Sequence, residues 1–112
     1  MAEIDASVIK AVNKFLEKVK ENGIPISSAY LFGSYASGKG SKWSDIDVAI
    51  ISPVMSYDRL EERIRLMKLS VTIDSRIEPV PFRPDTFVDE DPLAWEIKRK
   101  GILVSIEPQG TV

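Results

Sequence analysis

Apolar residues near the start of the chain recur every three or four positions, which is the spacing of a helix with one buried face. They are Ile4, Val8, Val12, Phe15, Leu16 and Val19. Lysine and glutamate occupy most of the opposite side. Gly23 stands where a left-handed C-terminal cap is expected, and Pro25 prevents the helix from resuming. This pattern predicts a helix over residues 4–22 that packs against a sheet.

Two later stretches have the same helical period. Around residues 57–69 the apolar stripe consists of Leu60, Ile64, Met67 and Val71. Charged residues of alternating sign fill the other positions, which is typical of a solvated face with ion pairs along the helix rather than of a nucleic-acid-binding surface. Residues 92–100 are the third predicted helix, with Asp91 as the N-cap and Gly101 as the terminator.

Short apolar runs between these stretches predict strands. Residues 26–32 and 45–52 are the first two, and residues 102–106 add a short final one. Residues 76–82 alternate in the strand manner, but two prolines remove hydrogen-bond donors from the ladder, so this strand should lie at an edge of the sheet or leave the sheet midway. The resulting order of elements predicts an α/β fold: a small mixed sheet covered by helices, mainly on one face.

Length and composition narrow the class of protein. At 112 residues we expect a single domain over residues 1–112, large enough to bury about two thirds of the surface of the unfolded chain. Hydrophobic residues make up 44% and charged residues 29%, as in an ordinary soluble globular protein. No apolar run approaches the roughly 20 residues of a membrane span.

The absence of cysteine excludes a disulfide framework and fits a reducing cytoplasm, so we expect a cytoplasmic protein without a membrane association. The net charge of −2 argues against binding duplex nucleic acid by bulk charge.

An acidic pair opens the second predicted strand. Because residues two apart on a strand point to the same side, Asp45 and Asp47 share one face, with their side chains about 6.5 to 7 Å apart along the strand. Two like charges so close disfavour each other's ionisation, and a divalent cation removes that penalty. Oxygen ligands suit magnesium, and a chain without histidine or cysteine does not suit a usual zinc site.

A glycine-serine turn precedes the acidic pair. If a helix starts at Gly33-Ser34, its free amide groups and its positive dipole end would face an anion such as a polyphosphate. The loop that follows carries Lys39 and Lys42, which would either meet phosphate oxygens or remain solvated. Trp43 would either stack on a base or cover the loop as a hydrophobic lid. The residues leave both pairs of alternatives open.

Gly33-Ser34, ten intervening residues and Asp45-Ile46-Asp47 together resemble the signature of the minimal nucleotidyltransferases, the small antitoxin-type members of the DNA polymerase beta-like superfamily. The resemblance covers residues 26–82 closely and implies the nucleotidyltransferase fold. It also calls for a third carboxylate on a strand next to the Asp-x-Asp strand. Glu78 is the acid within residues 76–82, and Asp74 in the preceding turn is its rival. Glutamate departs from the commoner aspartate, and a small shift of the metal would absorb the extra methylene.

The resemblance implies a magnesium-dependent transfer of a nucleoside monophosphate, most often AMP from ATP. Asp45 and Asp47 would hold two Mg²⁺ ions about 4 Å apart, and Glu78 would complete the second metal site or accept a proton. Ser34, the amides after Gly33 and Lys42 would bind the nucleotide. Small proteins similar to this one commonly pair with a helical HEPN-type ribonuclease and attach AMP to that toxin. Two alternatives remain: a catalytically silent antitoxin that neutralises its partner by contact, and a nucleotide-binding regulatory domain without turnover.

Overall fold

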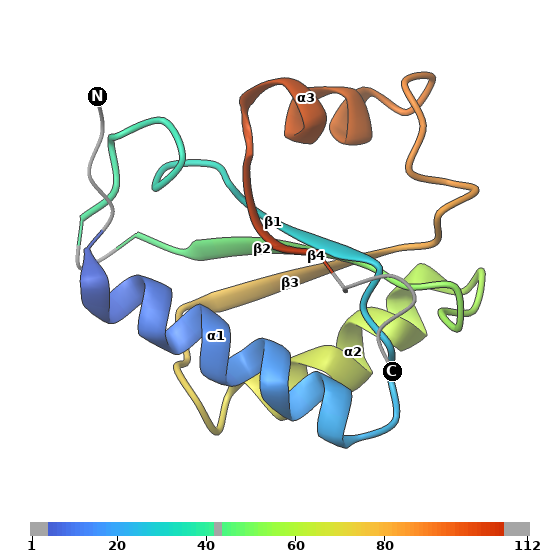
Figure 1. Cartoon of the computed structure of the whole chain (residues 1–112), viewed down its shortest axis with the longest axis horizontal. Coiled ribbons are helices and arrows are strands. Elements are labelled where there is room, and N and C mark those ends of the chain that lie inside the picture. The colour runs from blue at the N-terminus through green and yellow to red at the C-terminus, as the bar shows by residue number, and fades with distance from the viewer. Residues whose placement is uncertain (1–4, 42–43, 107–112) are drawn as a thin grey trace.

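A mixed four-stranded sheet organises the part of the chain that the computed structural model describes, residues 5–41 and 44–106 (Figure 1). The elements follow in the order α1 (Ala6–Glu21), β1 (Ser28–Phe32), β2 (Ile46–Ile51), α2 (Arg59–Ser70), β3 (Ile77–Phe82), α3 (Pro92–Lys100) and β4 (Ile102–Ile106). The strands lie side by side in the order β3-β2-β1-β4, with β2 and β3 parallel and the other two pairs antiparallel. The predicted α/β class and order of elements are confirmed, and β3 with its two prolines lies at an edge.

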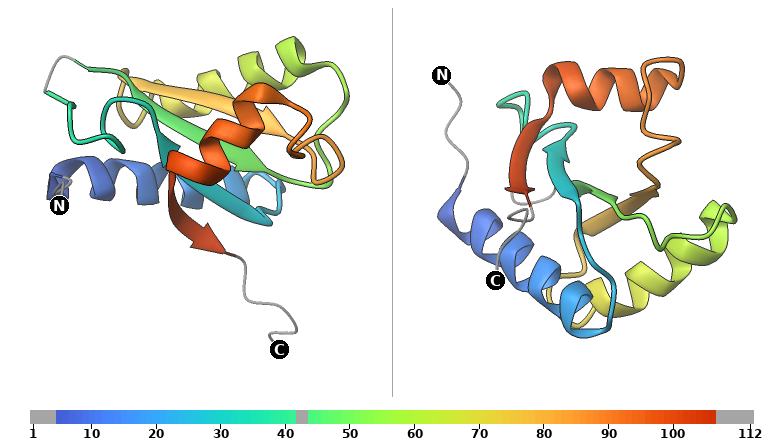
Figure 2. Two further views of the ribbon diagram at one scale, coloured as in Figure 1. Left: turned by 90° about the horizontal axis from the view of Figure 1, so that it is seen from above. Right: turned by 45° about the vertical axis from the view of Figure 1, so that its right-hand side comes forward.

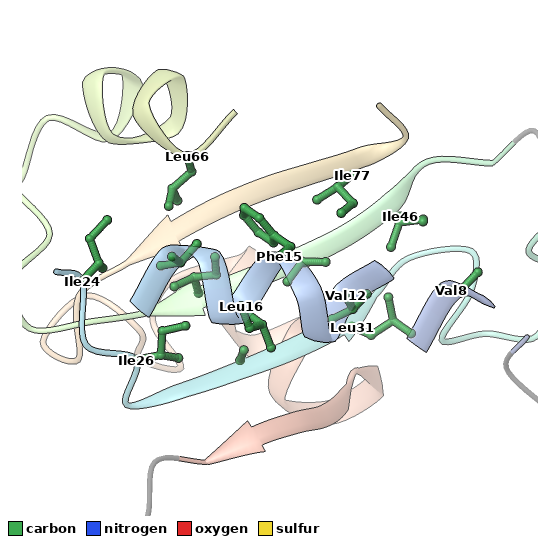
Figure 3. Packing of buried hydrophobic residues seen from close by; sticks show 14 of the residues in the cluster. Val8, Val12, Phe15, Leu16, Ile24, Ile26, Leu31, Ile46, Leu66 and Ile77 are labelled. Carbon is green, nitrogen blue, oxygen red and sulfur yellow. The ribbon is translucent and has the colours of Figure 1, made fainter. Parts of the chain in front are cut away.

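Helix α1 covers one face of the sheet with the predicted apolar stripe. The carboxylate of Asp5 accepts a hydrogen bond from the amide of Ser7 at 2.8 Å and so caps the helix, which therefore begins two residues later than predicted. Its buried residues are Val8, Val12, Phe15, Leu16 and Val19. Figure 3 shows Val8, Val12, Phe15 and Leu16 packed together with residues of the sheet and of α2. Ile4, also predicted to belong to this stripe, lies outside the described residues.

Helix α2 buries a different face from the one its apolar stripe suggests. Leu60 is 69% exposed and Ile64 is 46% exposed, and Met67 and Val71 are exposed as well, whereas Leu66 is fully buried in the core. Helix α2 packs along β3 and against α1 with the face of Glu62, Leu66 and Ser70 turned inward. The amide of Ser56 donates a hydrogen bond to the Glu62 carboxylate at 2.9 Å, which gives this buried group a partner. The apolar stripe exists, but its expected place in the core is wrong.

This orientation of α2 predicts that substitutions at Leu66 and Ile64, two positions apart on opposite faces of the helix, lower the stability unequally. We expect Leu66→Ala to lower the free energy of unfolding by about 2–5 kcal/mol, because it leaves a cavity in the core. We expect Ile64→Ala to change it by no more than about 0.5 kcal/mol, because Ile64 faces solvent. Denaturant unfolding of both variants measures the difference. Equal losses, or a larger loss for Ile64→Ala, would contradict the orientation.

Helix α3 lies across the opposite face of the sheet, as two further views show (Figure 2). The carboxylate of Asp91 accepts hydrogen bonds from the amides of Leu93 and Ala94, which fixes the predicted start of the helix. Ala94 and Ile97 pack there on a smaller cluster that includes residues of β2 and β3. Two helices on one face and one on the other agree with the prediction of a sheet covered mainly on one face. No helix in the described ranges is long and apolar enough to cross a membrane.

Candidate active site

Strand β2 points Asp47 toward the face of the sheet that carries α3. Ile46, Val48 and Ile50 alternate into the core beneath α1, while Ala49 and Ile51 belong to the cluster under α3. Asp47 has the same parity as this second set and so shares its side. Asp45 comes two residues earlier, directly before the first residue of the strand.

Strand β3 places Glu78 beside Asp47. The two residues are partners in the parallel register of β2 and β3, and Glu78 shares the side of Val80 and Phe82, which also pack under α3. On the other flank of Asp47, its antiparallel partner is Phe32, the last residue of β1. The structure therefore brings together an acid from each of two neighbouring strands and the end of a third strand.

The turn after β1 approaches the Asp47 carboxylate very closely. Gly33 has a φ of +76°, and a Cβ atom placed on it would lie 2.2 Å from Oδ2 of Asp47. Only glycine therefore fits at this position without moving the carboxylate. The amide of Ser37 donates to the carbonyl of Gly33 at 3.1 Å, and the amide of Lys39 donates to the carbonyl of Ser34 at 2.9 Å. These bonds close a single helical turn and no helix follows it, so the condition for a helix N-terminus and its dipole at Gly33-Ser34 is not met.

The Asp47 carboxyl lies in an environment that resists its ionisation. Partial burial is the main cause of a raised pKa, and the negative charges of Asp45 and Glu78 raise the pKa further. The positive charge of Arg63 acts in the opposite direction. A cation bound here would relieve the repulsion between these carboxylates.

The raised pKa predicts that Asp47→Asn stabilises the fold. A carboxyl whose folded pKa exceeds its ordinary value of 3.8 contributes stability below that value and loses the contribution as the pH rises through the folded pKa. At neutral pH the ionised wild-type group therefore costs stability that asparagine does not. We expect a higher denaturation midpoint for Asp47→Asn at neutral pH in EDTA and a smaller difference at mildly acidic pH. A lower midpoint at neutral pH would contradict the repulsion.

Glu78 is engaged by a residue that the sequence pattern did not single out. Nη2 of Arg63 lies 2.8 Å from Oε1 of Glu78, and both side chains are partly exposed. Within residues 5–41 and 44–106, no three acidic side chains converge closely enough to hold a metal ion. The rival acid Asp74 is paired with the guanidinium of Arg76, at 2.9 and 3.1 Å, and this hydrogen bonding lowers the pKa of Asp74.

The residues present fit a magnesium ion by their chemistry. Asp45, Asp47 and Glu78 offer carboxylate oxygens, the ligands that Mg²⁺ prefers, and the Gly33 turn leaves no side chain between the backbone and Asp47. Asp45 and Asp47 would be the first ligands, and Glu78 could join them once it leaves Arg63. Lys42, predicted to bind the nucleotide, and Trp43, expected either to stack on a base or to cover the loop, lie outside the described residues.

A cleft beside the Gly33 turn adds residues that sequence reasoning missed. Its volume is about 420 Å³, and it is lined by Phe32, Gly33, Ser37, Glu96 and Lys100. Lys100 is the last residue of α3, where a basic residue is commonly found because it interacts favourably with the helix dipole. Its sequence position therefore did not indicate that it lies near the Gly33 turn. The packing of α3 over the end of β1 brings Lys100 and this turn together.

Comparison with known proteins agrees with this geometry. Residues 12–99 match the family described as the nucleotidyltransferase domain. The chain belongs to this family. The nucleotidyltransferase domain described here is 31% identical, over 71 residues, to the protein adenylyltransferase MntA of Shewanella oneidensis. That match covers 63% of this chain and 50% of MntA, so the chain spans about half the length of the curated relative it matches.

Solved structures share the fold of the nucleotidyltransferase domain. A candidate nucleotidyltransferase from Sulfolobus solfataricus has a TM-score of 0.65 at 18% identity, with 100% of this chain and 97% of that chain covered. A variant of the MntA-HpeT toxin-antitoxin has a TM-score of 0.62 at 27% identity, covering 88% of this chain and 74% of that one. A toxin-antitoxin with AMP-PNP has the same score and identity, covering 87% and 74%. The prediction of a nucleotidyltransferase fold is confirmed.

Proposed function

We propose that this chain transfers AMP from ATP to a partner protein in a magnesium-dependent reaction. The observation that carries the proposal is the placement of Asp47, with Glu78 beside it in register and the backbone of Gly33 against its carboxylate. The likeness to an adenylyltransferase and to a toxin-antitoxin with AMP-PNP supports AMP as the transferred group and a toxin as the acceptor. The HEPN type of the partner and a cytoplasmic location stay predictions.

Each site residue has a role that its position supports. Asp45 and Asp47 would hold magnesium, and two ions are the number expected for this chemistry. Bound magnesium would supply charge neutralisation on the triphosphate and a lower pKa for the attacking hydroxyl. The Gly33-Ser34 turn would bind phosphate oxygens through its amides and the serine hydroxyl, next to the Asp47 carboxylate that approaches Gly33.

The proposed reaction balances without a further reactant. An acceptor hydroxyl oxygen forms a bond to the α-phosphorus of ATP, the bond from that phosphorus to the bridging oxygen breaks, and pyrophosphate leaves with the electron pair. The proton of the hydroxyl passes to a base. Glu78 lies beside Asp47 on the same face and, once released from Arg63, would complete the second metal site or accept that proton.

Transfer of label from ATP tests the proposal. The purified chain is incubated with magnesium, ATP labelled at the α-phosphate and the protein encoded by the neighbouring gene. We expect label on that protein, dependent on magnesium and lost in Asp45→Asn, while Asp85→Asn behaves as wild type because Asp85 pairs with Arg83 and Tyr57 elsewhere on the surface. Absence of label from every acceptor tried, with pyrophosphate release also absent, would overturn the proposal.

A second function is favoured by one observation, the pairing of Glu78 with Arg63 in place of a complete set of metal ligands in the described part of the chain. A chain of this kind could neutralise its partner by contact alone, with acidic residues that no longer have a catalytic function. Co-expression with the toxic partner separates the two functions. Protection of cells by the Asp45→Asn, Asp47→Asn double variant at the wild-type level would favour contact, and loss of protection would favour transfer.

A further inference from the structure

One guanidinium acts on two of the three site acids. Nη2 of Arg63 is 2.8 Å from Oε1 of Glu78, and Glu78 is the register partner of Asp47 across the parallel pair of strands. The positive charge of Arg63 also acts on Asp47 directly, since it opposes the effect of the neighbouring acids on that carboxyl. Arg63 is therefore the described cation most closely tied to the carboxylates of the site.

The fold brings Arg63 to this place from the far side of the sheet. Helix α2 buries Leu66 beneath the sheet but runs along the edge strand β3, so one of its faces reaches around that edge. Arg59, one turn before Arg63, takes the same course: its guanidinium lies 4.5 Å from the centre of the Phe82 ring and 3.3 Å from the carboxylate of Asp91. Two arginines thus extend from α2 over β3 toward the side that holds Asp47.

The Arg63–Glu78 pair is open to water. The side chain of Arg63 is 47% exposed and that of Glu78 is 30% exposed, so the interaction is screened and weak. A divalent cation held by Asp45 and Asp47 would attract the Glu78 carboxylate far more strongly than this pair does, because its charge is double and its distance is that of a ligand bond. Breaking the Arg63–Glu78 ion pair would therefore cost little free energy.

We propose that Arg63 is a positioning residue that holds Glu78 next to Asp47 but away from the metal, and that Glu78 leaves Arg63 when a divalent cation binds. The inference rests on the proposed function in one respect, that Asp45, Asp47 and Glu78 bind the cation. It goes further in assigning a role to Arg63 and in explaining why the three acids do not form a closed cluster. Arg63 thereby weakens cation binding by the chain alone.

Titration of the full chain with Mn²⁺ in the absence of nucleotide, followed by the electron paramagnetic resonance signal of the free ion, tests this competition. We expect Arg63→Gln to bind Mn²⁺ about two- to fivefold more tightly than wild type, which is the strength of an exposed ion pair expressed as an affinity ratio. Glu78→Gln should bind more weakly. Arg59→Gln is the matched control, because Arg59 lies one turn away on the same helix face, is equally exposed and pairs with Asp91 instead.

A double-variant cycle separates competition from simple loss of positive charge. If Arg63 acts by holding Glu78, Arg63→Gln should tighten binding much less in the Glu78→Gln background than in wild type. An equal gain in both backgrounds, or an equal gain from Arg59→Gln, would overturn the inference while leaving the proposed function intact. A wild-type chain that binds no Mn²⁺ at all would overturn the inference together with the metal part of the proposed function. Denaturation midpoints of all variants, expected to agree with wild type for Arg63→Gln, exclude a folding defect as the cause.

Discussion

Asp47→Asn is expected to reduce transfer of AMP by about a thousandfold or more. The substitution keeps the shape of the side chain but removes the charge that would hold magnesium, and metal assistance contributes several kcal/mol to stabilising such a transition state. Asp47 is also the acid that contacts the Gly33 turn, so no other described carboxylate is placed to take over its position. The rate of pyrophosphate release with a competent acceptor measures the loss.

The same variant separates a catalytic effect from a folding effect. Because Asp47→Asn is expected to raise the stability at neutral pH, a dead enzyme with a higher denaturation midpoint cannot be explained by unfolding. Asp89→Asn serves as the control, since Asp89 is an exposed aspartate paired with Lys98 beyond the site. Activity of Asp47→Asn within tenfold of wild type would show that this carboxylate does not support the reaction.

Gly33→Ala is expected to lower activity by about a hundredfold and stability by about 1–2 kcal/mol. The stability loss follows from placing a side chain at a φ of +76°. The activity loss follows from the new Cβ, which would lie 2.2 Å from Oδ2 of Asp47 and must displace it. A carboxylate at the end of a short side chain moves more easily than the backbone, and a displacement of about 1 Å is enough for a loss of this size.

Gly23→Ala is a closely matched control for the backbone effect. Gly23 has a φ of +84° after α1, and a Cβ atom there would meet no atom within 4 Å. We expect the same loss of stability as for Gly33→Ala and no loss of activity in the folded protein. Denaturant unfolding and label transfer on both variants give the comparison. Equal activities of the two variants would mean that the contact between Gly33 and Asp47 is not needed.

Much of the fold was predictable because the hydrophobic patterns of several helices and strands indicate which face of the element is suited to burial. The stripe from Val8 to Val19 admits only one buried face, and the alternation of Ile46, Val48 and Ile50 fixes which side Asp47 takes. The two prolines of β3 exclude a central position in the sheet. The place of Glu78 on a strand next to the acidic pair was implied by the family resemblance and not by these patterns, and Glu78 is the register partner of Asp47.

Other features depend on contacts that leave no periodic trace in the sequence. The stripe of Leu60 and Ile64 is the more regular one in α2, yet the helix packs along β3 with Glu62 and Leu66 buried. The Arg63–Glu78 pair joins residues 15 positions apart on different elements, so it follows only from their packing. The exposed charges of α2 gave no sign that one of them reaches the site.

Paramagnetic broadening by Mn²⁺ in the presence of a non-hydrolysable ATP analogue is the most direct test of a metal-nucleotide site at Asp47. In a ¹⁵N-labelled chain observed by NMR, the amide signals of Gly33, Ser34, Asp47 and Glu78 should lose intensity at the lowest Mn²⁺ concentrations, and Asp47→Asn should abolish this selectivity. Broadening that begins instead at the acidic segment 85–91, or that spreads evenly over the chain, would contradict the proposed site.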